Sequence, residues 1–265
     1  IYLGKVKKIV PGLNASFVNV GHEKDGFLHY FDLGPQVNSF KKFTEKIISK
    51  KLNTASLKNF RREKDTLKEG KIQEVLKGGE HIMVQVSKEP ISSKGPRLST
   101  ELSFAGRYMV LIPFSDRVSI SQKIKSSEEK SRLKKLIHSI KPKGFGVIIR
   151  TVAEEKKVAE LDRDMKNLYK KWQSIFKKLK TAKLTDRIHG ELNRSSAILR
   201  DLLNSEFTKI HVNSPELYTE LKEYLSRISP EQEKIVKLYK GEVPIFQKMN
   251  ITQQVKGSFG KTTSM

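Results

Sequence analysis

Hydrophobic and polar residues alternate along the start of the chain, which is the pattern of half-buried β-strands. In the second of these runs Val18 falls on one face and Phe17 on the other. In the third run Leu28 points inward and Phe27 outward. The same alternation returns over residues 81–89, and Pro90 ends it. The pattern therefore predicts a small sheet whose polar face carries two phenylalanine rings.

Further along the chain, hydrophobic positions three and four residues apart predict helices. The clearest seam is Val158, Leu161, Met165, Leu168, Trp172, Ile175 and Leu179. This seam either packs against a sheet in the core or joins a partner helix in a short coiled coil. Ser126 and Glu129 predict a capping box at the start of an earlier helix, and Ser214-Pro215 predicts another helix start. Beyond residue 190, strands and helices alternate, which is typical of a small α/β layer.

The charge of the chain indicates what it binds. Lys and Arg number 52 against 29 acidic residues, which gives a formal net charge of +23. Such a charge favours a polyanionic partner, nucleic acid above all, over a protein that is merely rich in lysine. The outward Phe17 and Phe27 lie close to lysines in the sequence, and single-stranded nucleic acid binds where bases stack on rings and phosphates meet cations. The alternative is that either ring packs under a loop.

The segment 37–70 interrupts the strand pattern with a Lys-rich stretch that also contains Asn, Thr and Ser. Phe40, Phe43 and Ile47 are spaced for a short amphipathic helix at most. The segment is longer than an ordinary connection between strands. We expect a mobile, solvated excursion; the alternative is an arm that contacts RNA.

Two stretches carry a resemblance to a known family. The pattern G-K-V-x-x-I-x-P-G-L-x-A-x-F-V-x-V-G-x-x-x-x-G-F-L, which starts at Gly4, resembles the S-one-type RNA-binding domain of the ribonuclease E/G family. VQVSKEPISSKGPRLSTELSFAGRYMVLIP resembles that family's passage into its next domain. The resemblance implies an α+β multidomain fold. Its parts would be a five-stranded OB-fold barrel (1–99) with the 37–70 insertion, a mixed α/β 5′-sensor domain (100–190) and a partial ribonuclease-H-like subdomain (191–265).

The resemblance also implies binding residues. Phe17, Phe27 and Lys94 match the family's RNA-contacting positions of the barrel. The residues that match its pocket for a 5′-terminal monophosphate are Arg150, Thr151, Gly106 and Val110, and Lys123 is expected to bind RNA. An Arg fork can hold two phosphate oxygens, and a Thr hydroxyl adds a neutral donor. One position departs from the family, because Gln122 stands where the first residue of a basic pair is expected.

Catalytic chemistry is harder to find. The six His are scattered, Cys is absent, and no phosphate-binding loop occurs, so no metal or nucleotide site is predicted. Asp162 and Asp164 are expected to face solvent on a helix. The family resemblance implies magnesium held by two Asp, and a zinc-linking Cys motif, both beyond Met265. We therefore expect a chain that binds RNA but does not cleave it alone.

The expected context follows from the same resemblance. Ile1 is not an initiator Met, which predicts a fragment of a longer protein. The full-length protein is expected to be a cytoplasmic, homo-oligomeric endoribonuclease without a membrane span, acting on single-stranded RNA with a 5′-monophosphate. Two alternatives stay open, namely a non-catalytic, ribosome- or RNA-associated OB-fold protein and a scaffold that recruits a partner through its long helix.

Overall fold

The computed structural model describes residues 1–190, 194–204 and 206–259. Contacts divide the chain into two compact units, Ile1–Glu191 and Leu192–Met265. The predicted start of the last domain, residue 191, lies outside the described residues, and the division into three domains stays a prediction. Across the described ranges, no helix has the length and apolarity that crossing a membrane requires.

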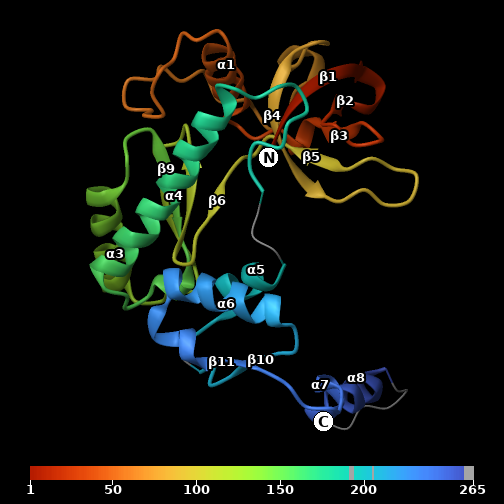
Figure 1. Cartoon of the computed structure of the whole chain (residues 1–265). Helices are drawn as coiled ribbons and strands as arrows, with labels where there is room; N and C mark the ends of the chain where they lie inside the picture. Colours follow the sequence, from red (N-terminus) through yellow and green to blue (C-terminus); the bar gives the residue numbers. More distant parts are fainter. Residues whose placement is uncertain (191–193, 205, 260–265) are drawn as a thin grey trace. The chain divides into compact units, whose positions relative to one another are not determined.

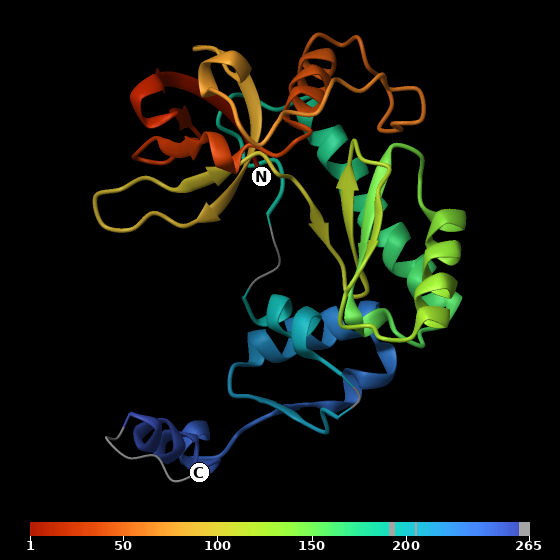
Figure 2. The ribbon, with the colours of Figure 1, turned by 180° about the vertical axis from the view of Figure 1, so that it is seen from behind.

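The first unit contains a closed barrel of five strands, as predicted (Figure 1). Around the barrel the strand order is β1 (Tyr2–Val10), β2 (Ala15–Asn19), β3 (Gly26–His29), β5 (Arg97–Ser99) and β4 (His81–Lys88). Neighbouring strands are antiparallel except for β3 and β5, which are parallel. Between β4 and β5 the chain forms a long arm that protrudes from the barrel in both views (Figures 1 and 2).

The barrel interior follows the period-two prediction. Val18 and Leu28 are fully buried inside it, together with Val84 and Leu98 from the later strands. Phe17 and Phe27 point to the outside and are half-buried. The alternation of the sequence thus separates an aliphatic core from an aromatic outer face.

The segment 37–70 is not the solvated excursion that we expected. It begins with helix α1 (Val37–Ile48), whose Phe40, Phe43 and Ile47 are buried. The Phe43 ring stacks on Trp172 with centroids 4.9 Å apart. The Trp172 Nε1–H donates to the backbone oxygen of Ala55 at 2.7 Å, so the segment after α1 is also held. The prediction was wrong because a face of apolar side chains suffices to bury one side of a helix whose remaining positions are mostly polar or charged.

A second sheet follows the barrel in this unit. Its strand order is β6 (Phe104–Ala105), β7 (Met109–Pro113), β9 (Phe145–Ile149) and β8 (Val118–Ile120), with only β8 and β9 parallel. Helices α3 (Ser127–Ile140) and α4 (Val158–Leu179) lie on one face of this sheet (Figure 2). Met109, Leu111, Val147 and Ile149 point toward them and are buried. The opposite face carries Val110 and Ile148, which is 41% exposed.

The long helix α4 is a core element of its own unit. The seam positions from Leu161 to Leu179 are buried, which confirms packing in the core, and only Val158 in the first turn is exposed. At the start of α3 the Ser126 Oγ accepts the Glu129 N–H, as predicted. The Glu129 carboxylate, however, accepts hydrogen bonds from Arg132 and from the Glu155 N–H.

The second unit is a small α/β layer. Its elements are α5 (Arg194–Leu202), β10 (Ile210–Val212), α6 (Pro215–Ile228), the 3-10 helix η4 (Pro230–Ile235), β11 (Val236–Leu238), α7 (Ile245–Lys248) and α8 (Ile251–Ser258). Strands β10 and β11 pair in parallel, and the Ser214 Oγ caps α6 by accepting the Leu217 N–H. The predicted strand and helix order is confirmed. Its assignment as a ribonuclease-H-like subdomain stays a prediction.

Candidate nucleic-acid interface

The two outward phenylalanines form an aromatic pair on the barrel. Phe17 on β2 lies directly opposite Phe27 on β3 in the antiparallel register. Their ring centroids are 5.8 Å apart at an interplanar angle of 66°. Because both rings stay half-buried, each keeps apolar surface that a nucleobase can cover.

A surface cavity of about 590 Å³ lies beside this pair. It is lined by Phe17, Lys24, Asp25, Phe27, Ser93, Lys94, Gly95 and Arg97. Three cations thus stand against one carboxylate around two aromatic rings. The structure therefore brings together the three barrel residues that the family resemblance singled out.

Gly95 lets the protruding arm approach the barrel. A Cβ at this position would lie 2.1 Å from the backbone oxygen of Asp25, which a side chain cannot do without moving the backbone. The neighbouring Lys94 is exposed, and its N–H donates to the Ile91 oxygen at 3.0 Å within the arm. The close approach at Gly95 therefore places Lys94 at the wall of the cavity.

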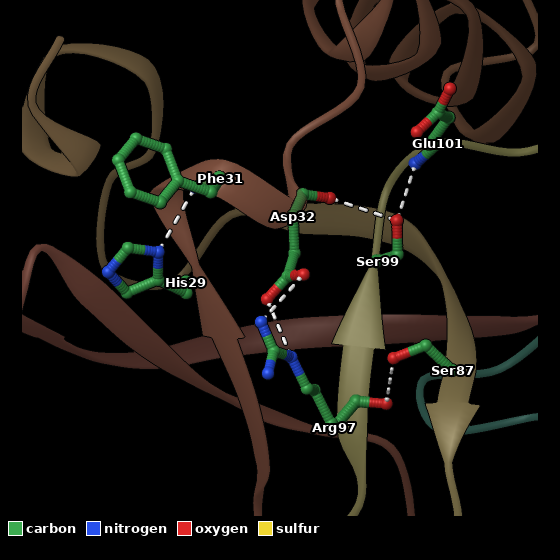
Figure 3. Close-up of polar contacts among 7 residues, drawn as sticks. All are labelled: His29, Phe31, Asp32, Ser87, Arg97, Ser99 and Glu101. Carbon is green, nitrogen blue, oxygen red and sulfur yellow. Dashed lines mark hydrogen bonds and ion pairs between the residues drawn. The ribbon is translucent and has the colours of Figure 1, made fainter. Parts of the chain in front are cut away.

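The orientation of Arg97 is fixed by an acid that sequence reasoning did not consider. Arg97 lies opposite Phe27 in the β3–β5 register. Its Nε and Nη2 donate to the two Asp32 carboxylate oxygens at 3.0 and 3.1 Å (Figure 3). This hydrogen bond to Asp32 raises the pKa of the Arg97 guanidinium. Such a bidentate pair holds the planar guanidinium in one direction at the edge of the cavity.

A second group of residues meets at one edge of the β6–β9 sheet. Strands β8 and β9 are parallel, with Ile120 opposite Ile149, so their carboxyl ends coincide. The residues that follow them, Ser121 and Arg150, therefore leave the sheet side by side. The Ser121 N–H donates to the Ile149 oxygen at 2.9 Å and ties the two ends together.

Arg150 and Thr151 are both held at this edge. The Arg150 Nη1 donates to the backbone oxygen of Gly106 at 2.9 Å. The hydroxyls of Thr151 and Ser121 are 2.8 Å apart and share a hydrogen bond. Lys123 follows two residues after Ser121 and is exposed, as is Gln122. These contacts place Arg150 beside the turn that contains Gly106, and Thr151 beside Ser121.

Asp164 corrects the sequence interpretation, which placed it in solvent. Its carboxylate accepts the backbone N–H of Tyr108 at 2.8 Å and that of Arg107 at 3.3 Å. Burial raises the pKa of this carboxyl, and the backbone N–H donors act against that increase. Asp162, by contrast, lies in a surface ion pair with Lys166 at 2.6 Å. The helical spacing contained a signal, since Asp164 lies three residues after Leu161 and four before Leu168, both buried.

The same carboxylate explains why Gly106 has no side chain. A Cβ on Gly106 would lie 2.5 Å from an Asp164 oxygen. The family resemblance places Gly106 in the pocket for a 5′-terminal monophosphate, and that role stays a prediction. The structure adds an internal reason, because the turn packs directly on the Asp164 carboxylate. Val110 lies on the outer face of the sheet, opposite Ile148 in the β7–β9 register.

The described part of the chain offers no group of three or more His, Asp or Glu side chains arranged to hold a metal ion.

Comparison with known proteins identifies the family. A model of the ribonuclease E/G family matches residues 103–265. The chain belongs to the ribonuclease E/G family. Ribonuclease G of Escherichia coli K12 is 32% identical over 256 residues, which cover 97% of this chain and 48% of that protein. Ribonuclease G of Haemophilus influenzae is 30% identical over 270 residues. Ribonuclease E of a Synechocystis strain is 36% identical over 229 residues, which cover 85% of this chain and 30% of that protein.

This ribonuclease E/G chain spans about half the length of the ribonuclease G relatives that it matches. The first alignment covers 97% of this chain, so it extends well beyond residues 103–265, which the family model matches. The family assignment therefore rests on the barrel unit and on the second unit together.

Proposed function

We propose that this chain is the RNA-binding and 5′-end-sensing portion of an endoribonuclease that cleaves single-stranded RNA. The observation that carries the proposal is that one unit of this ribonuclease E/G family member contains two groups of residues. One is an aromatic pair beside a basic cavity, and the other is an Arg-Thr pair at the end of a strand. The first suits bases, and the second suits a terminal phosphate.

The barrel site is proposed to bind the body of the strand. Phe17 and Phe27 stack against unpaired bases, while Lys24, Lys94 and Arg97 meet phosphates. Base–aromatic stacking contributes about 1–3 kcal/mol per base and tolerates any sequence. Duplex RNA cannot present its bases in this way, because they are stacked on one another.

The sheet edge is proposed to bind the 5′-terminal monophosphate. The bond from Arg150 to the Gly106 oxygen fixes where the guanidinium lies. The Thr151 hydroxyl is already oriented by Ser121, and Lys123 adds a positive charge nearby in the sequence. Val110 and Gly106 shape the apolar side of the same edge. A charge-assisted bond to phosphate contributes on the order of 1.5–3 kcal/mol, which a 5′-hydroxyl end cannot offer.

Cleavage itself is assigned to the part of the protein outside this chain. The resemblance implies an Asp pair that holds magnesium, and a zinc-linking Cys motif, in that part. We infer that the whole protein is a cytoplasmic homo-oligomer that processes RNA with this chain as its recognition portion.

The test is RNA binding by the purified chain with and without magnesium. We expect tight binding of single strands and weak binding of the matching duplex. The affinity should decrease with salt, at about −0.7 in the log–log slope for each phosphate neutralised. Binding of duplex as strongly as single strands would contradict the barrel proposal. Magnesium-dependent cleavage by this chain would contradict the assignment of catalysis elsewhere.

A further inference from the structure

One aromatic ring beside the barrel site has no assigned role. Phe31 follows β3 in a short 3-10 helix, η2 (Tyr30–Asp32), and is 76% exposed. Its neighbour Tyr30 is buried and donates its hydroxyl to the Leu67 oxygen at 2.9 Å. The Phe31 ring lies edge-on to the Tyr30 ring, with centroids 6.4 Å apart, and keeps its other surfaces exposed.

Phe31 continues the aromatic series of the barrel face. The ring centroids of Phe17 and Phe27 are 5.8 Å apart, those of Phe27 and His29 6.4 Å, and those of His29 and Phe31 5.0 Å. The His29 Nδ1 also accepts the Phe31 N–H at 3.1 Å (Figure 3). His29 thus positions Phe31 through both its ring and its nitrogen. The four rings form a continuous series from β2 to η2.

Cations line the cavity at one end of this aromatic series, and an ion pair lies near the other end. Asp32 is next to it in the chain, and the Arg97 guanidinium engages both of its carboxylate oxygens. Figure 3 shows this pair beside the His29–Phe31 contact. Lys94 and Arg97 line the cavity at the Phe27 end of the series.

We propose that Phe31 is a further stacking position, which binds a nucleobase of the same RNA strand beyond the base on Phe27. His29 acts as its positioning residue. The proposal rests on the function proposed for the barrel, and it extends the preferred substrate to a longer run of unpaired nucleotides. Stacking on an exposed ring needs no sequence preference, so the extension selects for length of single strand and not for base identity.

The experiment measures affinity of the chain for single-stranded RNA oligonucleotides with a 5′-hydroxyl, graded in length. Phe31→Ala should weaken binding of the long oligonucleotides by about fivefold or more, and Phe31→Tyr should restore it. Short oligonucleotides that reach only Phe17 and Phe27 should bind the unmutated chain and the Phe31→Ala variant equally. The control is Phe246→Ala, which removes another exposed phenylalanine, 61% exposed, from α7 in the second unit.

A second measurement locates the base. Abasic positions placed one at a time along the oligonucleotide should weaken binding by the unmutated chain at several places. One of these losses should vanish in Phe31→Ala and return in Phe31→Tyr. If Phe31→Ala binds every oligonucleotide as the unmutated chain does while Phe17→Ala binds weakly, the inference fails and the barrel function stands. If neither variant alters binding, the barrel function itself is wrong.

Discussion

The barrel face and the sheet edge differ in how many hydrogen bonds their proposed RNA-binding side chains already form within the protein. On the barrel, the Phe17 and Phe27 rings contact each other and point outward from strands whose other side forms a closed core. At the sheet edge, Arg150 is bonded to Gly106, Thr151 to Ser121, and the Gly106 turn to Asp164. A site of the first kind can lose a side chain and stay folded. In a site of the second kind, recognition and local structure depend on the same bonds.

The two regions also rest on different cores. The barrel encloses its own cluster, which includes Val18, Leu28 and Val84. The sheet edge lies over the larger cluster that α1, α4 and the second sheet share. Substitutions in the larger cluster should therefore weaken recognition of the RNA 5′ end more than they weaken stacking of bases on the barrel. The following predictions test that separation.

The largest effect is expected from Phe43→Ala in α1. The side chain is fully buried and stacks on Trp172, so its removal should lower the free energy of unfolding by about 3–5 kcal/mol. A urea or thermal melt measures this change. Ile48→Ala on the same helix is the control, since Ile48 is 40% exposed and should cost far less. If Phe43→Ala lowers the free energy of unfolding only slightly, the 37–70 segment does not pack in the core and the expectation of a solvated segment holds.

A smaller loss is expected from Asp164→Ala. The change leaves the N–H groups of Tyr108 and Arg107 without this acceptor, which should cost about 1–3 kcal/mol of stability. It should also loosen the Gly106 turn and reduce preference for a 5′-monophosphate. Asp162→Ala removes a carboxylate two residues earlier on the same helix, in a surface ion pair, and should alter neither quantity measurably. Equal effects of the two variants would show that Asp164 does not position the turn.

On the barrel, Phe17→Ala and Phe27→Ala should each weaken RNA binding by about 1–3 kcal/mol and leave the melting temperature nearly unchanged. Because the rings touch, the double variant should lose less than the sum of the single losses. Affinity at low temperature and a thermal melt separate binding from folding. A large fall in melting temperature with unchanged affinity would make the rings part of the core.

The smallest effect is expected from Lys94→Ala. Removing one phosphate contact should reduce the salt slope of RNA binding by about 0.7 without altering stability. Lys166→Ala is the control, because that lysine lies on the outer side of α4 beside Asp162. If Lys166→Ala reduces the salt slope of RNA binding as much as Lys94→Ala does, the RNA is attracted to the whole basic surface and not to Lys94 in particular.

Much of this architecture could be predicted from the sequence, and the exceptions have physical causes. Strict alternation identified the inward Val18 and Leu28, because a closed barrel buries one side of every strand. The seam of α4 was equally clear. The burial of Phe43 was missed because its partner Trp172 lies far along the chain, and no local pattern shows that contact.

For the candidate sites, residue types could be predicted, but the bonds between them could not. The family resemblance pointed to Arg150, Thr151 and Gly106, and the structure places them at one edge. Asp164 was missed because it lies at the margin of the hydrophobic face of α4. At that position the sequence alone does not show whether a carboxylate faces water or accepts backbone N–H groups of another element. Asp32 was missed because its partner Arg97 comes from another strand.

The central claim is that Arg150 and Thr151 distinguish RNA ends, and a competition assay tests it directly. Two oligonucleotides identical except for a 5′-hydroxyl or a 5′-monophosphate compete for the chain. The account predicts a preference of roughly tenfold or more for the monophosphate. That preference should be lost in Arg150→Ala, whereas binding that depends on Phe17 and Phe27 remains. Equal affinity of the unmutated chain for both ends would contradict the claim.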